Sequence, residues 1–234
     1  MIDQTNKAII FCAHGSRDGT YNSNFLKLIK TLKSITDTEN IFHCYIEKNR
    51  PLIKETINEV SQRYKQIYFY PLMFFDGYHM NEDIKKEVEF QKNQNKIDIK
   101  LIEKISLTKD LANVFIKEIS KKLSKRKKNM LIISYSKSSK SNVIKEVKKY
   151  LKKISNCVEI SKICCVGEEI NLFKNIHNNK IKNLNIILHP IFFFEGFLYK
   201  INLINLKKIT NFKSLKPISH YSEVVDILIR KIKG

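Results

Sequence analysis

An internal repeat constrains the fold of this chain more than any other feature of its sequence. Residues 71–79, PLMFFDGYH, align without a gap with residues 190–198, PIFFFEGFL. Residues 8–14 align in the same way with residues 130–136. A chain of 234 residues that repeats itself at this distance is long enough for two domains of similar fold.

Short apolar runs predict the strands of both halves. They span residues 8–13, 41–46, 67–75 and 97–102 in the first half, and residues 130–134, 158–166 and 184–194 in the second. The segments between them carry apolar residues at helical spacing. In these segments we expect Asn22 or Ser23 to cap the first helix, Asn81 to cap a later one, and residues 168–176 to form a short helix.

Strands that alternate with helices predict parallel sheets joined by right-handed crossovers. We therefore predict an α/β fold of two similar lobes, each a small parallel sheet flanked by helices, which face each other across a cleft. The highly basic residues 120–129 resemble a linker. The predicted lobes are accordingly residues 1–124 and residues 125–234.

The composition is strongly basic, with 43 Lys and Arg residues against 23 Asp and Glu residues and a formal net charge of +20. Lysines are spread over every amphipathic segment, and the abundance of Lys, Ile and Asn is typical of an AT-rich genome. The charge alone therefore does not predict a nucleic-acid partner, although it suits a substrate with many carboxylates. The five cysteines show no CxxC spacing, which favours buried thiols over a metal cluster.

The sequence shows no sign of a membrane partner. No apolar run approaches the ~20 residues that cross a bilayer. The first residues, MIDQTNK, lack the basic start and the apolar core of a signal peptide. We therefore expect a cytoplasmic protein.

Three polar residues follow predicted strands of the first half: His14, Glu47 and His79. The carboxyl ends of parallel strands share one edge of the sheet, where α/β proteins bind ligands, so these side chains can converge. Two imidazoles and a carboxylate suit a divalent first-row metal and also suit proton removal near neutral pH. The alternative is that each is structural, as a strand-end histidine or a solvated loop acid.

The two halves carry chemically different residues at positions that the repeat aligns. In the second half Ser136 stands in place of His14, Leu198 in place of His79, and roughly Val166 in place of Glu47. This one-sided loss predicts that the first lobe holds the site and that the second lobe forms a wall of it.

Three motifs of the first half resemble those of the CbiX/SirB-type sirohydrochlorin chelatases, class II chelatases related to ferrochelatase. They are AHGSRD at residues 13–18, with Asn24 and Phe25 in the next helix, CYIEKNRPLIKETI at residues 44–57, and YPLMFFDGYHMNEDI at residues 70–84. Their order and spacing suit the family, and the duplicated length resembles its two-lobe members. The loop at residues 18–21 departs from the pattern because it lacks the proline often seen after the aspartate.

The resemblance implies an enzyme that inserts Fe2+ or Co2+ into sirohydrochlorin without ATP or any cofactor besides the substrate metal. His14 would bind the metal and accept protons, His79 would be the second metal ligand, and Glu47 would contact metal or substrate and carry protons away. Substrate-binding residues would be Ser16 and Arg17, on peripheral carboxylates, and the pocket-lining Phe74, Phe75, Asp76, Gly77 and Tyr78. The product would serve sirohaem or cobalamin synthesis, with sirohaem slightly favoured because no His-rich tail is present, and the protein would be a monomer.

Other functions fit the sequence less well. A tetrapyrrole or metal carrier would use the same three residues, and only turnover separates it from an enzyme. A histidine phosphatase would need an arginine where Ala13 stands, and a serine hydrolase acting through Ser16 would need a G-x-S-x-G elbow. A specific nucleic-acid binder is not expected, because clustered arginines, zinc-ligand spacing and RNA-binding motifs are missing.

Overall fold

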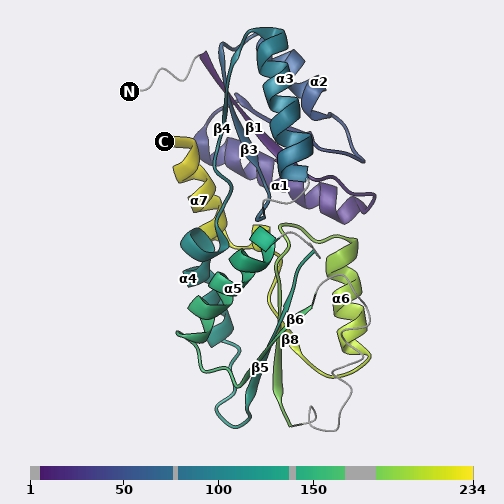
Figure 1. Cartoon of the computed structure of the whole chain (residues 1–234), viewed down its shortest axis with the longest axis vertical. Helices are drawn as coiled ribbons and strands as arrows, with labels where there is room; N and C mark the ends of the chain where they lie inside the picture. The colour runs from purple at the N-terminus through teal and green to yellow at the C-terminus, as the bar shows by residue number, and fades with distance from the viewer. Residues whose placement is uncertain (1–5, 76–78, 137–140, 167–182, 234) are drawn as a thin grey trace. The chain divides into compact units, whose positions relative to one another are not determined.

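Strands and helices alternate throughout the computed structural model, which describes residues 6–75, 79–136, 141–166 and 183–233 (Figure 1). The strands are β1 (Lys7–Ala13), β2 (Ile41–Tyr45), β3 (Gln66–Pro71), β4 (Asp98–Leu101), β5 (Asn129–Ser134), β6 (Lys162–Val166), β7 (Asn185–Pro190) and β8 (Lys213–Ser214). The α-helices are α1 (Gly19–Thr36), α2 (Ile53–Ser61), α3 (Lys86–Asn95), α4 (Ala112–Ser120), α5 (Ser141–Ser155), α6 (Phe197–Lys207) and α7 (Ser222–Lys233). Two π-helices, η2 (His79–Lys85) and η3 (Leu107–Leu111), and a 3₁₀ turn, η6 (Ile218–His220), complete the described elements.

The strands form two four-stranded parallel sheets with the orders β2-β1-β3-β4 and β6-β5-β7-β8. The repeat extends to the strand register. Pro71 lies opposite Cys12 in the first sheet, and its repeat partner Pro190 lies opposite Ser134 in the second. The prediction of an α/β fold with two similar parallel sheets flanked by helices is therefore confirmed.

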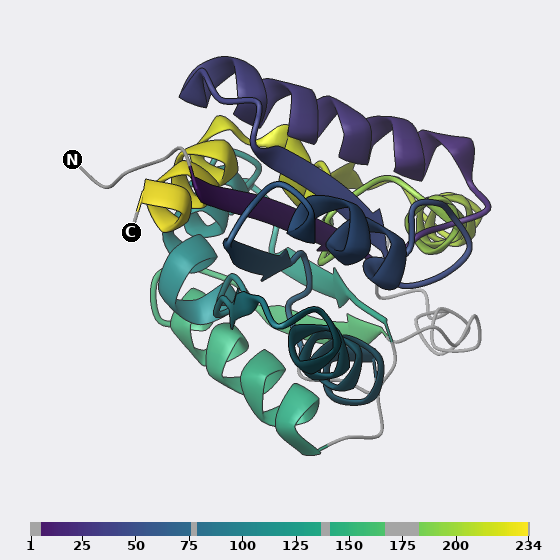
Figure 2. The same ribbon diagram turned by 90° about the horizontal axis from the view of Figure 1, so that it is seen from above.

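The central strand of the first sheet, β1, is buried on both faces. Ala8, Ile10 and Cys12 pack into one core with apolar residues of α2 and α3. On the opposite face, Phe25 of α1 meets the ring of Tyr45 edge-on, with centroids 5.3 Å apart. Figure 2 shows α1 and α3 on opposite faces of this sheet. This two-sided burial explains why β1 reads as an unbroken apolar run.

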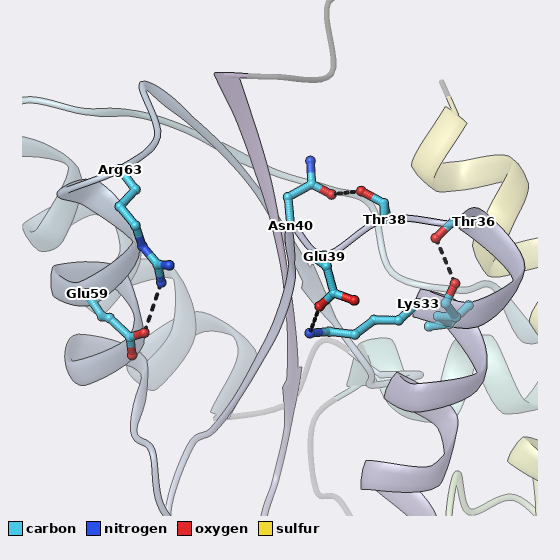
Figure 3. A network of polar contacts seen from close by, with 8 residues as sticks. Lys33, Thr36, Thr38, Glu39, Asn40, Glu59 and Arg63 are labelled. Atoms are coloured by element: carbon cyan, nitrogen blue, oxygen red, sulfur yellow. Dashed lines mark hydrogen bonds and ion pairs between the residues drawn. The ribbon is translucent and has the colours of Figure 1, made fainter.

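The turn between α1 and β2 is fixed by polar contacts (Figure 3). Lys33 Nζ lies 3.3 Å from a carboxylate oxygen of Glu39, and the Thr38 hydroxyl donates to Asn40 Oδ1. Asn40 also binds β1 directly, because its Nδ2 donates to the Lys7 carbonyl and its own carbonyl accepts from Ile9 N–H. These contacts set the register of β2 against β1. Glu59 of α2 pairs at 3.1 Å with Arg63, which lies just beyond the end of that helix.

The core of the second unit contains a buried histidine. His189 on β7 is fully buried, and its Nε2 lies 2.6 Å from the Tyr150 hydroxyl of α5. Its ring centroid lies 4.5 Å from that of Phe115 on α4, and its Nδ1 has no hydrogen-bond partner among the described residues. Burial lowers the pKa of His189 to about 3, so this imidazole is neutral in the folded protein.

The chain divides into compact units at other positions than residue 124. One unit comprises Met1–Ile105 with Val225–Gly234, and the other comprises Ser106–Val224. Two contacts explain this division. Phe115 of α4 packs on His189 of the second sheet, and the Tyr70 hydroxyl of β3 donates to the carbonyl of Lys231 in α7. The basic segment that resembles a linker therefore lies inside the second unit.

Several local predictions need correction. Asp18, rather than Asn22 or Ser23, caps α1, because its side chain accepts from Thr20 N–H. Asn81 lies within η2 instead of at a helix start. Strand β3 ends at Pro71 instead of residue 75, and β7 ends at Pro190 instead of residue 194. The last hydrogen bonds to the central strands come from the next residues, Leu72 N–H to the Cys12 carbonyl and Ile191 N–H to the Ser134 carbonyl.

The remaining local findings concern cysteines, the predicted short helix and membrane spans. Cys12 and Cys44 are buried free thiols, whereas Cys157 is exposed. The helix predicted at residues 168–176 lies outside the described residues. Within the described ranges, none of the helices combines the length and the apolar character needed to cross a bilayer.

His189 makes the stability of the protein depend on pH. Its pKa is lower in the folded protein than in the unfolded chain, so below pH ~6.5 the unfolded chain binds a proton that the folded protein does not. The contribution of neutral His189 to the free energy of unfolding is complete above pH ~6.5. It decreases as the pH falls towards 3, by up to about 1.4 kcal/mol per pH unit. We expect His189→Gln, which cannot titrate, to show a weaker decrease in the free energy of unfolding between pH 6.5 and 4.5. Urea denaturation of both proteins at each pH measures this, and parallel curves would contradict it.

Candidate functional site

His14 and Glu47 lie side by side beyond the ends of two paired strands. His14 directly follows β1, and Glu47 follows β2, its neighbour in the sheet. The parallel pairing continues past both strands, because Ile46 N–H donates to the Ala13 carbonyl at 3.0 Å and Glu47 N–H donates to the His14 carbonyl at 3.1 Å. The side chains meet with 3.8 Å between His14 Nε2 and Glu47 Oε1, and they are 39% and 38% exposed. The predicted convergence of these two residues is thus present at an edge open to a ligand.

The tautomer of His14 follows from its second ring nitrogen. His14 Nδ1 lies 3.1 Å from the Gly15 carbonyl oxygen, which can only accept a hydrogen bond. This contact suits an imidazole with its proton on Nδ1. The lone pair is then on Nε2, the nitrogen that faces Glu47. A metal ion or a proton can be taken up there.

Lys48, which was not among the predicted site residues, lies next to this pair. Lys48 Nζ lies 3.1 Å from Glu47 Oε2, so the two oxygens of one carboxylate face an imidazole and an ammonium. Lys48 has a φ of 68°, a left-handed conformation that turns the chain sharply after Glu47. The only sequence signal for Lys48 is its place next to Glu47.

The loop after His14 depends on a glycine. Gly15 has a φ of 91°, and a Cβ atom added there would lie 1.9 Å from the Glu47 carbonyl oxygen. Both the conformation and the space therefore require glycine at this position. Burial raises the pKa of Tyr21 above its ordinary value, and backbone hydrogen bonds with His14 and Gly15 offset only part of this rise. Tyr21 thus supports this loop from α1.

The predicted carboxylate-binding residues lie in the same loop. The Ser16 hydroxyl accepts from Asp18 N–H at 3.0 Å, which ties it to the start of α1. Arg17 is exposed. Neither position is tested by a bound ligand, so their contact with substrate carboxylates stays a prediction.

The third motif is described only in part. His79 is the first residue of η2, and its side chain lies outside what the structure describes. Phe74 is buried and Phe75 is half-buried, with ring centroids 6.4 Å apart. The predicted pocket residues Asp76, Gly77 and Tyr78 lie outside the described residues. Among the described side chains no three His, Cys, Asp or Glu groups form a metal-binding cluster, so the role of His79 stays a prediction.

The second sheet carries different residues at the equivalent positions. Ser136, the repeat partner of His14, is exposed after β5, and Leu198, the partner of His79, lies in α6. His189 is buried in the core and therefore cannot serve an open site. His220 Nε2 lies 4.0 Å from Glu195 Oε1 in this unit, at positions unrelated by the repeat to His14 and Glu47.

One family model matches the part of the sequence that carries this pair. The CbiX family model matches residues 8–122, which include His14, Glu47 and His79. No curated protein matches the sequence.

Solved structures share the fold over almost the whole chain. SirB from Bacillus subtilis with Fe3+ superposes with a TM-score of 0.78 at 16% identity, covering 97% of this chain and 94% of that one. The sirohydrochlorin chelatase SirB from Bacillus subtilis subspecies spizizenii, in complex with cobalt, gives a TM-score of 0.77 at 16% identity with the same coverage. CbiX, the terminal enzyme of sirohaem biosynthesis in denitrifying bacteria, gives 0.66 at 10% identity, covering 97% and 98% of the two chains. At these identities the likeness concerns the fold.

The Gly15 geometry makes a prediction about stability. In Gly15→Ala the new Cβ meets the Glu47 carbonyl, and the left-handed backbone is strained by about 1–2 kcal/mol before the clash is counted. We therefore expect the free energy of unfolding to fall by more than about 1 kcal/mol. Gly19→Ala is the matched control, since nothing lies within 4 Å of its added Cβ and it begins α1, where alanine is a better helix former. Urea denaturation that finds both variants equally stable would contradict this account.

Proposed function

We propose, from the match of the CbiX family model to residues 8–122, that the protein is a sirohydrochlorin chelatase that inserts Fe2+ or Co2+. The observation that carries the proposal is the pair formed by His14 and Glu47, with 3.8 Å between nitrogen and oxygen at an open sheet edge. Such a pair offers one neutral nitrogen donor and one anionic oxygen donor to a divalent first-row metal.

Metal insertion requires both of the properties that this pair has. The ion must be held near the macrocycle, and the pyrrole N–H protons must be removed as the metal–nitrogen bonds form. His14 Nε2 presents the lone pair that binds the ion or accepts a proton, and Glu47 supplies a second donor beside it. Each proton then passes to water, since both side chains are partly exposed. His79 would provide a further metal ligand.

Cations beside the pair suit a substrate with many carboxylates. Lys48 already holds a carboxylate, that of Glu47, at 3.1 Å, and Arg17 is exposed three positions after His14. Carboxylates of sirohydrochlorin would bind these cations through charge-assisted hydrogen bonds. Capture of Lys48 by the substrate would release Glu47 towards the metal.

The choice between the two metals does not follow from the donor set. Imidazole and carboxylate bind Fe2+ and Co2+ with affinities ordered by the metals themselves, so a His and Glu site does not reverse that order. The SirB structures hold Fe3+ in one case and cobalt in another. We propose that this chain accepts either ion.

The proposal is tested by anaerobic metallation of sirohydrochlorin, followed by absorbance with Fe2+ and with Co2+. We expect His14→Ala to lower kcat by roughly 10²-fold or more, because it removes the metal-binding and proton-accepting nitrogen. Glu47→Gln should also slow the reaction, since it removes the charge but keeps the shape. The matched control is His220→Ala, a substitution of an exposed histidine in the second unit, which should keep wild-type kcat.

Three other outcomes would contradict the proposal. Tight sirohydrochlorin binding without faster metallation by either ion would favour a carrier. Equal kcat in His14→Ala and the wild type would remove His14 from the reaction. Absence of sirohydrochlorin binding would mean that the fold serves another substrate.

A further inference from the structure

Two asparagine side chains hold Ser16, the residue two positions after His14, from opposite sides. Asn49 Oδ1 accepts from Ser16 N–H at 2.7 Å, and Asn22 Nδ2 donates to the Ser16 carbonyl at 2.8 Å. Asn22 belongs to α1, whereas Asn49 belongs to the loop that follows Glu47. The loop of His14 is therefore attached both to the next helix and to the loop of the neighbouring strand.

Asn49 closes a ring of hydrogen bonds that contains both residues of the proposed site. Glu47 N–H donates to the His14 carbonyl at 3.1 Å, and Asn49 N–H donates to the Glu47 carbonyl at 2.8 Å. The Asn49 side chain then returns to Ser16. The two loops touch inside this ring, because a Cβ on Gly15 would lie 1.9 Å from the Glu47 carbonyl and 3.2 Å from Asn49 Oδ1.

This ring matters because His14 and Glu47 stand on two different loops and each side chain is more than a third exposed. Their separation depends on where the two backbones hold them, as well as on the contacts of His14 with Gly15 and of Glu47 with Lys48. Displacements of about 1 Å in a reacting group can cost roughly 10²-fold in rate. A contact that fixes one backbone against the other therefore influences catalysis without touching the substrate.

We propose that Asn49 is a positioning residue, which sets the distance between His14 and Glu47 by joining their loops through Ser16. Its role in turnover rests on the proposed chelatase function, whereas its role in ordering the two loops does not. The chemistry required of Asn49 is acceptance only, since its Oδ1 faces an N–H. The chemistry required of Asn22 is donation, since its Nδ2 faces a carbonyl oxygen.

Because Asn49 must accept a hydrogen bond and Asn22 must donate one, the same change from asparagine to aspartate should have opposite effects at the two positions. Asn49→Asp keeps the acceptor, so it should retain kcat within about threefold, whereas Asn49→Ala should lower kcat by roughly 10-fold to 10²-fold. Asn22→Asp loses the donor and places a carboxylate against the Ser16 carbonyl, so it should behave like Asn49→Ala. Asn58→Ala is the control, because Asn58 Oδ1 accepts from Asn95 Nδ2 between α2 and α3, away from these loops.

Amide hydrogen exchange of the same variants, followed by NMR, tests the ring independently of activity. In Asn49→Ala we expect the amides of Ser16, Glu47 and Asn49 to exchange at least about 10-fold faster, since opening of the ring exposes all three, and in Asn49→Asp to return to wild-type rates. Asn58→Ala should leave them unchanged. Faster exchange of Ser16 alone, or no recovery in Asn49→Asp, would overturn the proposal.

The two readouts also separate this proposal from the chelatase assignment. A wild-type protein without turnover would refute the chelatase function, and the exchange rates would still decide whether Asn49 joins the loops. If the wild-type enzyme is active and Asn49→Ala has the same kcat, the positioning role of Asn49 is refuted and the chelatase function is not.

Discussion

The site depends on the parallel pairing of β1 with β2, which continues one residue beyond β1 and two residues beyond β2. The hydrogen bonds from Ile46 to Ala13 and from Glu47 to His14 keep the two chains in register after the regular ladder ends. Residues separated by 33 positions in the sequence thereby become neighbours. Because β1 is buried on both faces, this edge is attached to the core of the unit. The exposed side chains of His14 and Glu47 thus project from a well-fixed backbone.

The two sheets show how one framework supports different chemistry. Tyr70 and His189 directly precede the repeat-related prolines on β3 and β7. Each binds a different partner: Tyr70 donates to the carbonyl of Lys231, and His189 shares a hydrogen bond with Tyr150. The backbone architecture has been kept in both units, while the buried polar contacts and the residues at the sheet edge have diverged. A histidine in the second unit therefore serves the core, whereas His14 in the first unit faces an open edge.

The sequence predicts where the strands lie better than where they end. It also predicts His14 and Glu47 better than the residues that hold them in place. Unbroken apolar runs identify β1 and β5 because these strands are buried on both faces. Strands β3 and β7 end at prolines inside longer apolar runs, so hydrophobicity alone does not reveal where they end. Similarly, α1 begins at the Asp18 cap, about two turns before Phe25, the first residue of its buried face. Which segments share a unit depends on contacts such as those of Phe115 and Tyr70 with residues far along the chain, and a single sequence does not reveal these contacts. His14 and Glu47 stand out because their residue types suggest chemistry. The side chains of Asn49 and Lys48 make their contacts because of the conformation of the loop after Glu47, for which a single sequence gives no signal.

The return of α7 to the first unit has a consequence for synthesis on the ribosome. Domains usually fold as they emerge, with the N-terminal part first. Here β1 to β4 emerge early, but residues 225–233, which belong with them, are made after the whole second unit. The Tyr70 hydroxyl cannot find its acceptor on Lys231 until then. The nascent first sheet must therefore wait for more than one hundred further residues before this face is closed, so the unit with the proposed active site is completed last.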